Sequence, residues 1–268
     1  MFKRILAALF SLAALSAGQA RADTARDYYF WRPATADAAP RPWAVLLPGS
    51  GGMSILGDDQ HYFRAAQWLN ARGIDALIVD YHHAARFVPA ARDGESGDRM
   101  AAIVRDAIAV EREHGRMGAN CPGAVIGWSL GGEGAWSLAR DGLSDSALAA
   151  AVMFYPTVRT PRPYANVLPI LVLQGQADNV TPVGDVQAFV SERAEGAGEL
   201  NVHVFAGATH GFDVPSLDPP RSMRLPPLVG QRVTFGYDAA AANNAYAELE
   251  AFLRRHTIIG GACGQASP

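Results

Sequence analysis

Apolar runs with little or no polar interruption recur along the chain and predict strands. They occupy residues 43–47, 74–79, 124–126, 148–154 and 168–173. An alternating segment at 202–205 and a short segment at 28–31 extend the series. Uninterrupted apolar runs are typical of strands that are buried on both faces of a parallel sheet.

Helical patterns lie between these runs. The clearest begins after Asp98, ends before Gly115 and repeats apolar side chains at spacings of three and four, namely Met100, Ile103, Val104, Ala107 and Ile108. Residues 132–140 and 238–256 are also compatible with helices. Alternating strands and helices predict an α/β fold, with a mostly parallel central sheet covered by helices on both faces. Residues 82–97 and 214–237 fit neither pattern.

The N-terminal segment has the pattern of a signal peptide. Lys3 and Arg4 precede an apolar stretch at 5–17, and Ala20 and Ala22 supply the small residues that a signal peptidase requires. The stretch is shorter than the roughly 20 residues that span a bilayer, so we expect no stable membrane anchor. We therefore expect a signal peptide at 1–22, cleavage near Ala22, a single domain at 23–268, and a periplasmic or secreted protein.

Composition and charge argue against one class of function, the binding of nucleic acid. The 268 residues are 49% hydrophobic and carry a formal net charge of −3. No basic run is longer than Arg254-Arg255, so the chain lacks the electrostatic signature of a nucleic-acid-binding protein.

A serine between glycines follows the apolar run at 124–126. The segment Gly127-Trp128-Ser129-Leu130-Gly131 joins a predicted strand to a predicted helix, which is the context of a catalytic serine on a sharp turn. A serine in a glycine-rich turn that only packs a helix on the sheet is the alternative. We take Ser129 as the candidate nucleophile.

The partners of a catalytic serine are a histidine base and an acid that orients it. Asp178 follows the strand predicted at 168–173, and His210 follows the one at 202–205. Serine, acid and histidine in this order match the α/β-hydrolase arrangement. The other candidates fall inside a strand, at helix ends, inside a helix or too late in the chain, namely His203, His114, His256, Asp185 and Asp213.

A glycine-rich loop follows the first long strand. In the α/β-hydrolase arrangement this loop and the residue after the nucleophile supply the N–H groups that bind an oxyanion. We assign these roles to Ser50 and Leu130. A phosphate-binding loop is the alternative, but the Gly-Lys-Ser/Thr sequence is absent.

These motifs resemble the dienelactone hydrolase family. The resemblance covers about residues 44–253 and is carried by Gly49-Ser50-Gly51-Gly52, Gly127-Trp-Ser-Leu-Gly131-Gly132, Gly175-Gln-Ala-Asp178 and Thr209-His210-Gly-Phe212. It implies an α/β-hydrolase fold and a cofactor-independent hydrolase that cleaves a small-molecule carboxylic ester or lactone through an acyl-enzyme. The founding members carry cysteine where this chain has Ser129, and an acidic residue in a loop where residues 46–53 have none.

Several expectations complete this interpretation. We expect a substrate pocket lined by Tyr81, His82, Phe87 and Phe212. A metal site is the alternative for the polar residues Asp58, Asp59, His61, His82 and His83, but no paired spacing such as His-Glu-x-x-His is present. A prolyl-oligopeptidase-like peptidase and a catalytically silent binding protein are the other functional alternatives. The sequence assigns neither the acyl and alcohol groups nor the oligomeric state.

The two cysteines fit the expected fold. Cys121 precedes the nucleophile strand, and Cys263 follows the last helix, which runs antiparallel to the sheet strands. Both would then lie on the side of the sheet away from the active site. Export would place them in an oxidising compartment, and we expect a structural Cys121–Cys263 disulfide.

Overall fold

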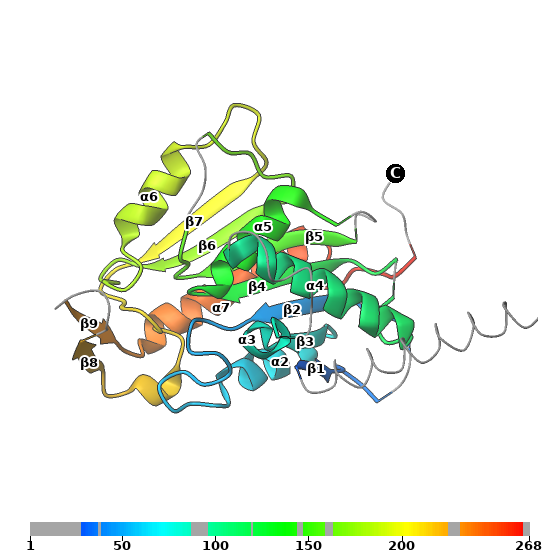
Figure 1. The fold of residues 1–268 in the computed structure, drawn as a ribbon, viewed down its shortest axis with the longest axis horizontal. Coiled ribbons are helices and arrows are strands. Elements are labelled where there is room, and N and C mark those ends of the chain that lie inside the picture. The colour runs from blue at the N-terminus through cyan, green and yellow to red at the C-terminus, as the bar shows by residue number, and fades with distance from the viewer. Residues whose placement is uncertain are drawn as a thin grey trace, which may run out of the picture.

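A seven-stranded sheet forms the centre of the molecule (Figure 1). The computed structural model describes residues 28–36, 39–86, 96–118, 120–143, 147–158, 163–224 and 231–264, so the predicted signal peptide and Phe87 lie outside the described residues. The strand order is β1-β3-β2-β4-β5-β6-β7. All neighbours are parallel except β1 and β3, which are antiparallel. The strands are β1 (Tyr29–Arg32), β2 (Trp43–Leu47), β3 (Asp75–Val79), β4 (Gly123–Trp128), β5 (Leu148–Phe154), β6 (Ile170–Gly175) and β7 (Leu200–Phe205).

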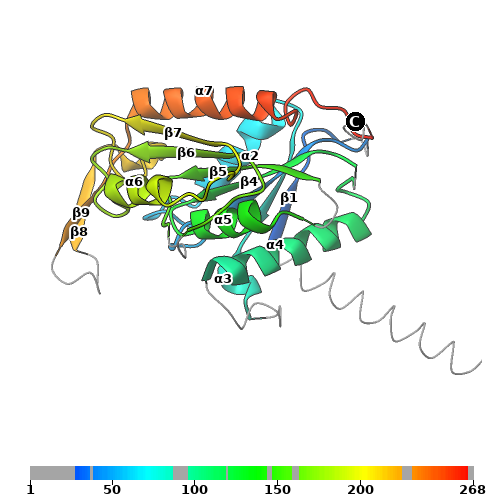
Figure 2. The same ribbon diagram turned by 90° about the horizontal axis from the view of Figure 1, so that it is seen from above.

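Helices cover both faces of this sheet (Figure 2). One face carries α3 (Tyr81–Ala84), α4 (Ser96–Glu113), α5 (Gly131–Asp141) and α6 (Val183–Ser191), and the other carries α2 (His61–Asn70) and α7 (Ala239–Arg255). The arrangement confirms the predicted fold class. In the described part of the chain, every helix is too short or too polar to cross a membrane.

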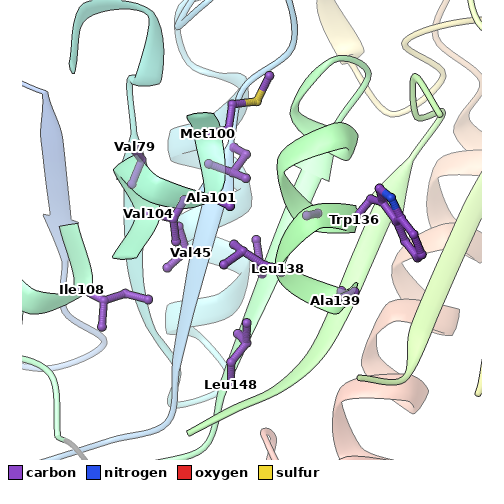
Figure 3. Close-up of a cluster of buried hydrophobic side chains, with 14 of the residues drawn as sticks. Val45, Val79, Met100, Ala101, Val104, Ile108, Trp136, Leu138, Ala139 and Leu148 are labelled. Carbon is purple, nitrogen blue, oxygen red and sulfur yellow. The ribbon is translucent and has the colours of Figure 1, made fainter. Parts of the chain in front are cut away.

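Each face of the sheet has its own apolar core. Figure 3 shows the first, where Met100, Val104 and Ile108 of α4 lie against Val45 and Val79 of the sheet. The second joins α2 and α7 to the opposite face through residues that include Leu69, Leu249, Phe252, Ile126 and Phe154. Burial of a side chain of this size contributes about 1.5–3 kcal/mol, so both helical layers are needed to hold the sheet.

The sequence pattern does not predict five of the elements. These are the helices α2 and α3, and, in the unassigned stretch at 214–237, the short helix η2 (Pro215–Leu217) and the hairpin of β8 (Arg221–Arg224) and β9 (Arg232–Phe235). Val233 and Phe235 of the hairpin are buried, while the arginines at its strand ends are exposed. Four-residue strands with this many arginines carry too short an alternation to be recognised.

A disulfide closes the amino end of the sheet. Cys121 is bonded to Cys263, across a sequence separation of 142 residues. The Trp43 indole is fully buried beside them, and its Nε1–H donates to the Cys121 carbonyl at 3.0 Å. A Cβ atom on Gly123 would lie 2.3 Å from the Trp43 ring. The tail after α7 is therefore tied to the start of β4 at the end of the sheet opposite the candidate site.

Candidate active site

Ser129 lies on a sharp turn between β4 and α5, at residues 128–131, which we call the elbow. Its φ is +51°, a left-handed conformation that costs an L-residue roughly 1–3 kcal/mol. Three backbone hydrogen bonds hold it there. The Ser129 N–H donates to the Phe154 carbonyl at 2.9 Å, and the Ser129 carbonyl accepts from Gly132 and Thr157, both at 2.9 Å. The backbone thus holds Ser129 strained at the carboxyl end of the sheet.

The glycines around Ser129 are required by close backbone contacts. A Cβ atom on Gly127 would lie 2.3 Å from the Gly131 carbonyl oxygen, and one on Gly131 would lie 2.3 Å from the Leu47 carbonyl oxygen. A Cβ atom on Gly49 would lie 3.3 Å from the Ser129 Cβ. The loop after β2 therefore runs directly against the serine.

His210 and Asp178 form a buried pair on the loops after β7 and β6. The distance from His210 Nδ1 to Asp178 Oδ2 is 2.8 Å, and the side chains are 6% and 0% exposed. Asp178 Oδ1 accepts the N–H groups of Val180 and Thr181 at 2.8 and 2.9 Å, which orients Oδ2 toward the imidazole. With its hydrogen on Nδ1, His210 has Nε2 free to accept a proton.

The His210 loop is held by its surroundings. The Tyr155 ring lies 4.5 Å and the Phe235 ring 5.4 Å from the His210 ring, measured between centroids. The Gly236 N–H donates to the His210 carbonyl at 3.1 Å. A Cβ atom on Gly175 would lie 2.4 Å from the Ala208 carbonyl oxygen, so glycine is required where the Asp178 and His210 loops pass each other.

Ser129 makes no hydrogen bond with His210 among the described residues. The two are connected through the backbone of β5, because Phe154 accepts the Ser129 N–H and the next residue, Tyr155, contacts the His210 ring. Catalytic hydrogen bonds are often long in ligand-free structures and tighten when substrate binds. The elbow and the His210–Asp178 pair thus adjoin the same strand end.

The loop at 47–52 is fixed by tyrosines. The Gly49 N–H donates to the Tyr62 hydroxyl at 2.8 Å, and the Tyr81 hydroxyl donates to the Gly49 carbonyl at 3.3 Å. Burial raises the pKa of both phenols well above the ordinary value, so both keep their protons. In the described part of the chain, the N–H groups of Ser50 and Leu130 donate no hydrogen bond and could bind an oxyanion. Sequence reasoning missed Tyr62, since an aromatic residue at a helix start gives no signal of this contact.

The expected pocket residues take different positions. His82 is exposed, with Nε2 3.3 Å from the Gly49 carbonyl oxygen. Tyr81 is 5% exposed and supports the loop at 47–52. The expectation for Phe212 is wrong, because its side chain is 0% exposed and packs against Phe154 and Tyr155 in the core.

The polar residues considered for a metal site have other partners. Asp58 accepts hydrogen bonds from Arg64 and Ser216. Burial opposes ionisation of Asp58, but these hydrogen bonds outweigh it and lower its pKa to about 2. His83 Nδ1 lies 2.6 Å from the Asp80 carboxylate. No group of three potential metal ligands occurs within the described ranges.

Comparisons with solved structures agree with the fold. A dienelactone hydrolase-like promiscuous phosphotriesterase from metagenomic libraries superposes with a TM-score of 0.61 at 20% identity, over 85% of this chain and 99% of its own. A thermophilic esterase of the planctomycete Thermogutta terrifontis, with propionate bound, superposes with a TM-score of 0.58 at 19% identity, over 87% and 91%. At such identities the structures show the fold alone.

Sequence comparison identifies the family. No curated protein matches the chain significantly. The profile of the dienelactone hydrolase family matches residues 57–257, which is more than half of the chain and includes Ser129, Asp178 and His210. The chain therefore belongs to the dienelactone hydrolase family, whose members are carboxylic ester hydrolases of the α/β-hydrolase superfamily.

Proposed function

We propose that this protein hydrolyses a small-molecule carboxylic ester or lactone through a Ser129–His210–Asp178 triad. The observation that carries the proposal is the strained Ser129 on the elbow, beside a buried His210–Asp178 pair on the two following loops. A serine hydroxyl becomes an effective nucleophile when a positioned base accepts its proton, and His210 has the free nitrogen that this role needs.

The reaction follows from these positions. His210 Nε2 takes the Ser129 proton while Oγ bonds to the ester carbonyl carbon. The N–H groups of Ser50 and Leu130 stabilise the resulting oxyanion, and Asp178 stabilises the imidazolium. The intermediate then expels the alcohol, which takes the proton from His210. Water, deprotonated by His210, attacks the acyl-enzyme, and the acid leaves as Ser129 recovers its proton.

A fluorophosphonate that traps activated serines tests the triad. We expect the folded protein to be labelled at Ser129, located by mass spectrometry of the modified peptide, and labelling to disappear in His210→Ala. His203→Ala is the matched control, because His203 lies on β7 and faces Glu248 rather than the site. Absence of labelling in folded wild-type protein would contradict the triad and favour the binding-protein alternative.

Substrate class is a separate test. We expect turnover of p-nitrophenyl esters and simple lactones, and no cleavage of peptides ending in proline amides. Peptide cleavage with ester turnover at background would instead support the prolyl-oligopeptidase-like alternative.

The proposal includes export. The disulfide between Cys121 and Cys263 supports an oxidising compartment, where such bonds persist. Expression of the full chain in a bacterial host, followed by cell fractionation and intact mass measurement, tests this. We expect a periplasmic or secreted product that begins at Asp23, and a cytoplasmic product that retains residues 1–22 would contradict it.

A further inference from the structure

Asp213 is a buried carboxylate that the proposed reaction does not use. It lies three residues after His210, and its side chain is 0% exposed. The Tyr155 hydroxyl donates to Oδ1 at 2.6 Å and the Trp128 Nε1–H donates to Oδ2 at 2.9 Å. His61 Nε2 lies 3.5 Å from Oδ2. One carboxylate on the His210 loop thus contacts the end of β4, the residue after β5 and the start of α2.

Both hydrogen-bond donors are adjacent to the candidate triad. Trp128 directly precedes Ser129. Tyr155 directly follows the residue that accepts the Ser129 N–H, and its own φ is +35°. The Tyr155 ring contacts the His210 ring, and the Tyr155 carbonyl accepts the Thr181 hydroxyl at 3.0 Å. Asp213 is therefore hydrogen-bonded both to Trp128 of the elbow and to Tyr155, whose ring contacts His210.

Packing alone does not account for a carboxylate at this position. Desolvating a carboxylate costs several kcal/mol, and apolar residues of similar volume often serve stability as well or better. Among the described residues no arginine forms an ion pair with Asp213. Burial lowers the pKa of His61, and Asp213 only partly opposes this, so the imidazole is neutral. What the carboxylate supplies is two short, directional, charge-assisted hydrogen bonds.

We infer that Asp213 is a positioning residue, which holds the elbow and the His210 loop in the relative position that the triad needs. The inference rests on the proposed function. Burial and the Asp213 charge both raise the pKa of Tyr155 well above its ordinary value, so Tyr155 remains a donor. Without the carboxylate, the donors on Trp128 and Tyr155 lose their shared acceptor, and the hydrogen-bonded link from the His210 loop to the elbow and to Tyr155 is lost.

The test is Asp213→Asn, which keeps the shape but has one acceptor oxygen for two donors. A displacement of about 1 Å in an active site can cost 100-fold, so we expect kcat for p-nitrophenyl acetate to fall roughly 10- to 100-fold with KM unchanged. The rate of fluorophosphonate labelling at Ser129 should fall by the same factor. Tyr155→Phe removes one of the two bonds and should give a smaller fall in kcat. The double variant should be no slower than Asp213→Asn, because Asp213→Asn already breaks the Tyr155 bond and also removes the charge from the acceptor of the Trp128 bond.

Glu111→Gln is the matched control for loss of a buried carboxylate. Glu111 is 1% exposed and bound to Arg116 near the end of α4, in the helical layer on the opposite face from α2. We expect this variant to lose stability and keep kcat. Equal kcat in folded Asp213→Asn and wild type would overturn the inference, as would equal losses of kcat in Asp213→Asn and Glu111→Gln. If Asp213→Asn does not fold, an unchanged kcat in Tyr155→Phe would overturn it.

A second readout separates this inference from the proposed function. The low-field proton resonance of the His210 Nδ1–H reports the Asp178 bond without turnover. We expect Asp213→Asn to shift or broaden it and Glu111→Gln to leave it unchanged. Failure of wild-type labelling would contradict the triad, whereas an unchanged resonance in Asp213→Asn would contradict the positioning role alone.

Discussion

The two ends of the sheet are stabilised in different ways. The carboxyl end holds strained backbone at Ser129 and Tyr155 and two carboxylates with fully buried side chains, Asp178 and Asp213. The amino end holds an indole buried against a disulfide. Strain and buried charge lower stability, while a covalent link across 142 residues raises it. The carboxyl end therefore gathers strained backbone and buried carboxylates around the elbow, while the amino end, which also holds the buried Asp75 and a positive φ at Thr257, adds a covalent constraint.

This difference predicts which substitutions mainly reduce turnover and which mainly reduce stability. A change at the carboxyl end should reduce turnover more than stability, and a change at the amino end should reduce stability more than turnover. A carboxyl-end variant that loses stability but keeps turnover, or an amino-end variant that loses turnover but keeps stability, would contradict this division.

The largest effect is expected for Ser129. Ser129→Ala should lower kcat by about 10⁴-fold or more, as for triads in general. Ser129→Gly should be equally inactive but more stable by roughly 1 kcal/mol, since glycine adopts a positive φ without strain. Steady-state kinetics and urea unfolding measure the two quantities. Residual turnover of Ser129→Ala close to wild type would contradict the assignment of the nucleophile.

The disulfide should show the reverse pattern. In the chain-entropy model a bridge that closes 142 residues contributes up to about 5 kcal/mol. We expect Cys121→Ala with Cys263→Ala to lose most of this amount in urea unfolding while kcat at 25 °C stays within about twofold, a change of well under 1 kcal/mol. Reduced wild-type protein is the control and should unfold like the double variant. A large loss of kcat at unchanged stability would contradict the proposed division.

A glycine of the elbow should affect both quantities. In Gly127→Ala the new Cβ would meet the Gly131 carbonyl at 2.3 Å, so the elbow must move. We expect a loss of about 1–3 kcal/mol in stability together with a fall in kcat. Gly184→Ala is the control, because nothing lies within 4 Å of a Cβ on that α6 residue and alanine favours a helix. Unchanged kcat in Gly127→Ala would show that the serine tolerates displacement.

The steric pattern around the elbow explains why much of the site is predictable from the sequence. Gly127, Gly131 and Gly175 are required by contacts between backbone segments, so each leaves a mark at a fixed spacing from Ser129 or Asp178. Ser129, Asp178 and His210 each follow a predicted strand, so the strand pattern also gives their order along the chain. All of these spacings join residues that are close in sequence, so the sequence alone reveals them.

The supporting contacts could not be predicted. Tyr62 reaches Gly49 across 13 residues, and Asp213 reaches Trp128 across 85 and Tyr155 across 58. Such pairs are determined by how the helices and loops pack, and a single sequence does not show which distant residues will meet. The same reason explains the wrong expectation for Phe212. It lies two residues after His210 in the sequence, but the packing of the loops buries its side chain in the core.

The smallest expected effect is on pH dependence, and it compares one histidine at each end. Burial is the largest cause that lowers the pKa of His61, and Arg64 adds to it, while Asp213 and Asp58 oppose it. Burial and Arg255 likewise lower the pKa of His256, which Glu199 opposes. Both imidazoles are therefore neutral when folded, and the unfolded chain takes up their protons near pH 6.5.

Stability from these groups is full above about pH 6.5 and is lost as pH falls toward the lowered folded values. We expect the melting temperature of wild-type protein to fall between about pH 6.5 and 5. His61→Gln should flatten this slope more than His256→Gln, because His61 is completely buried and His256 only partly. Scanning calorimetry across this range measures both slopes. A slope unchanged in His61→Gln would mean that a group other than His61 takes up the proton, and would place the pH response outside the contact between His61 and Asp213.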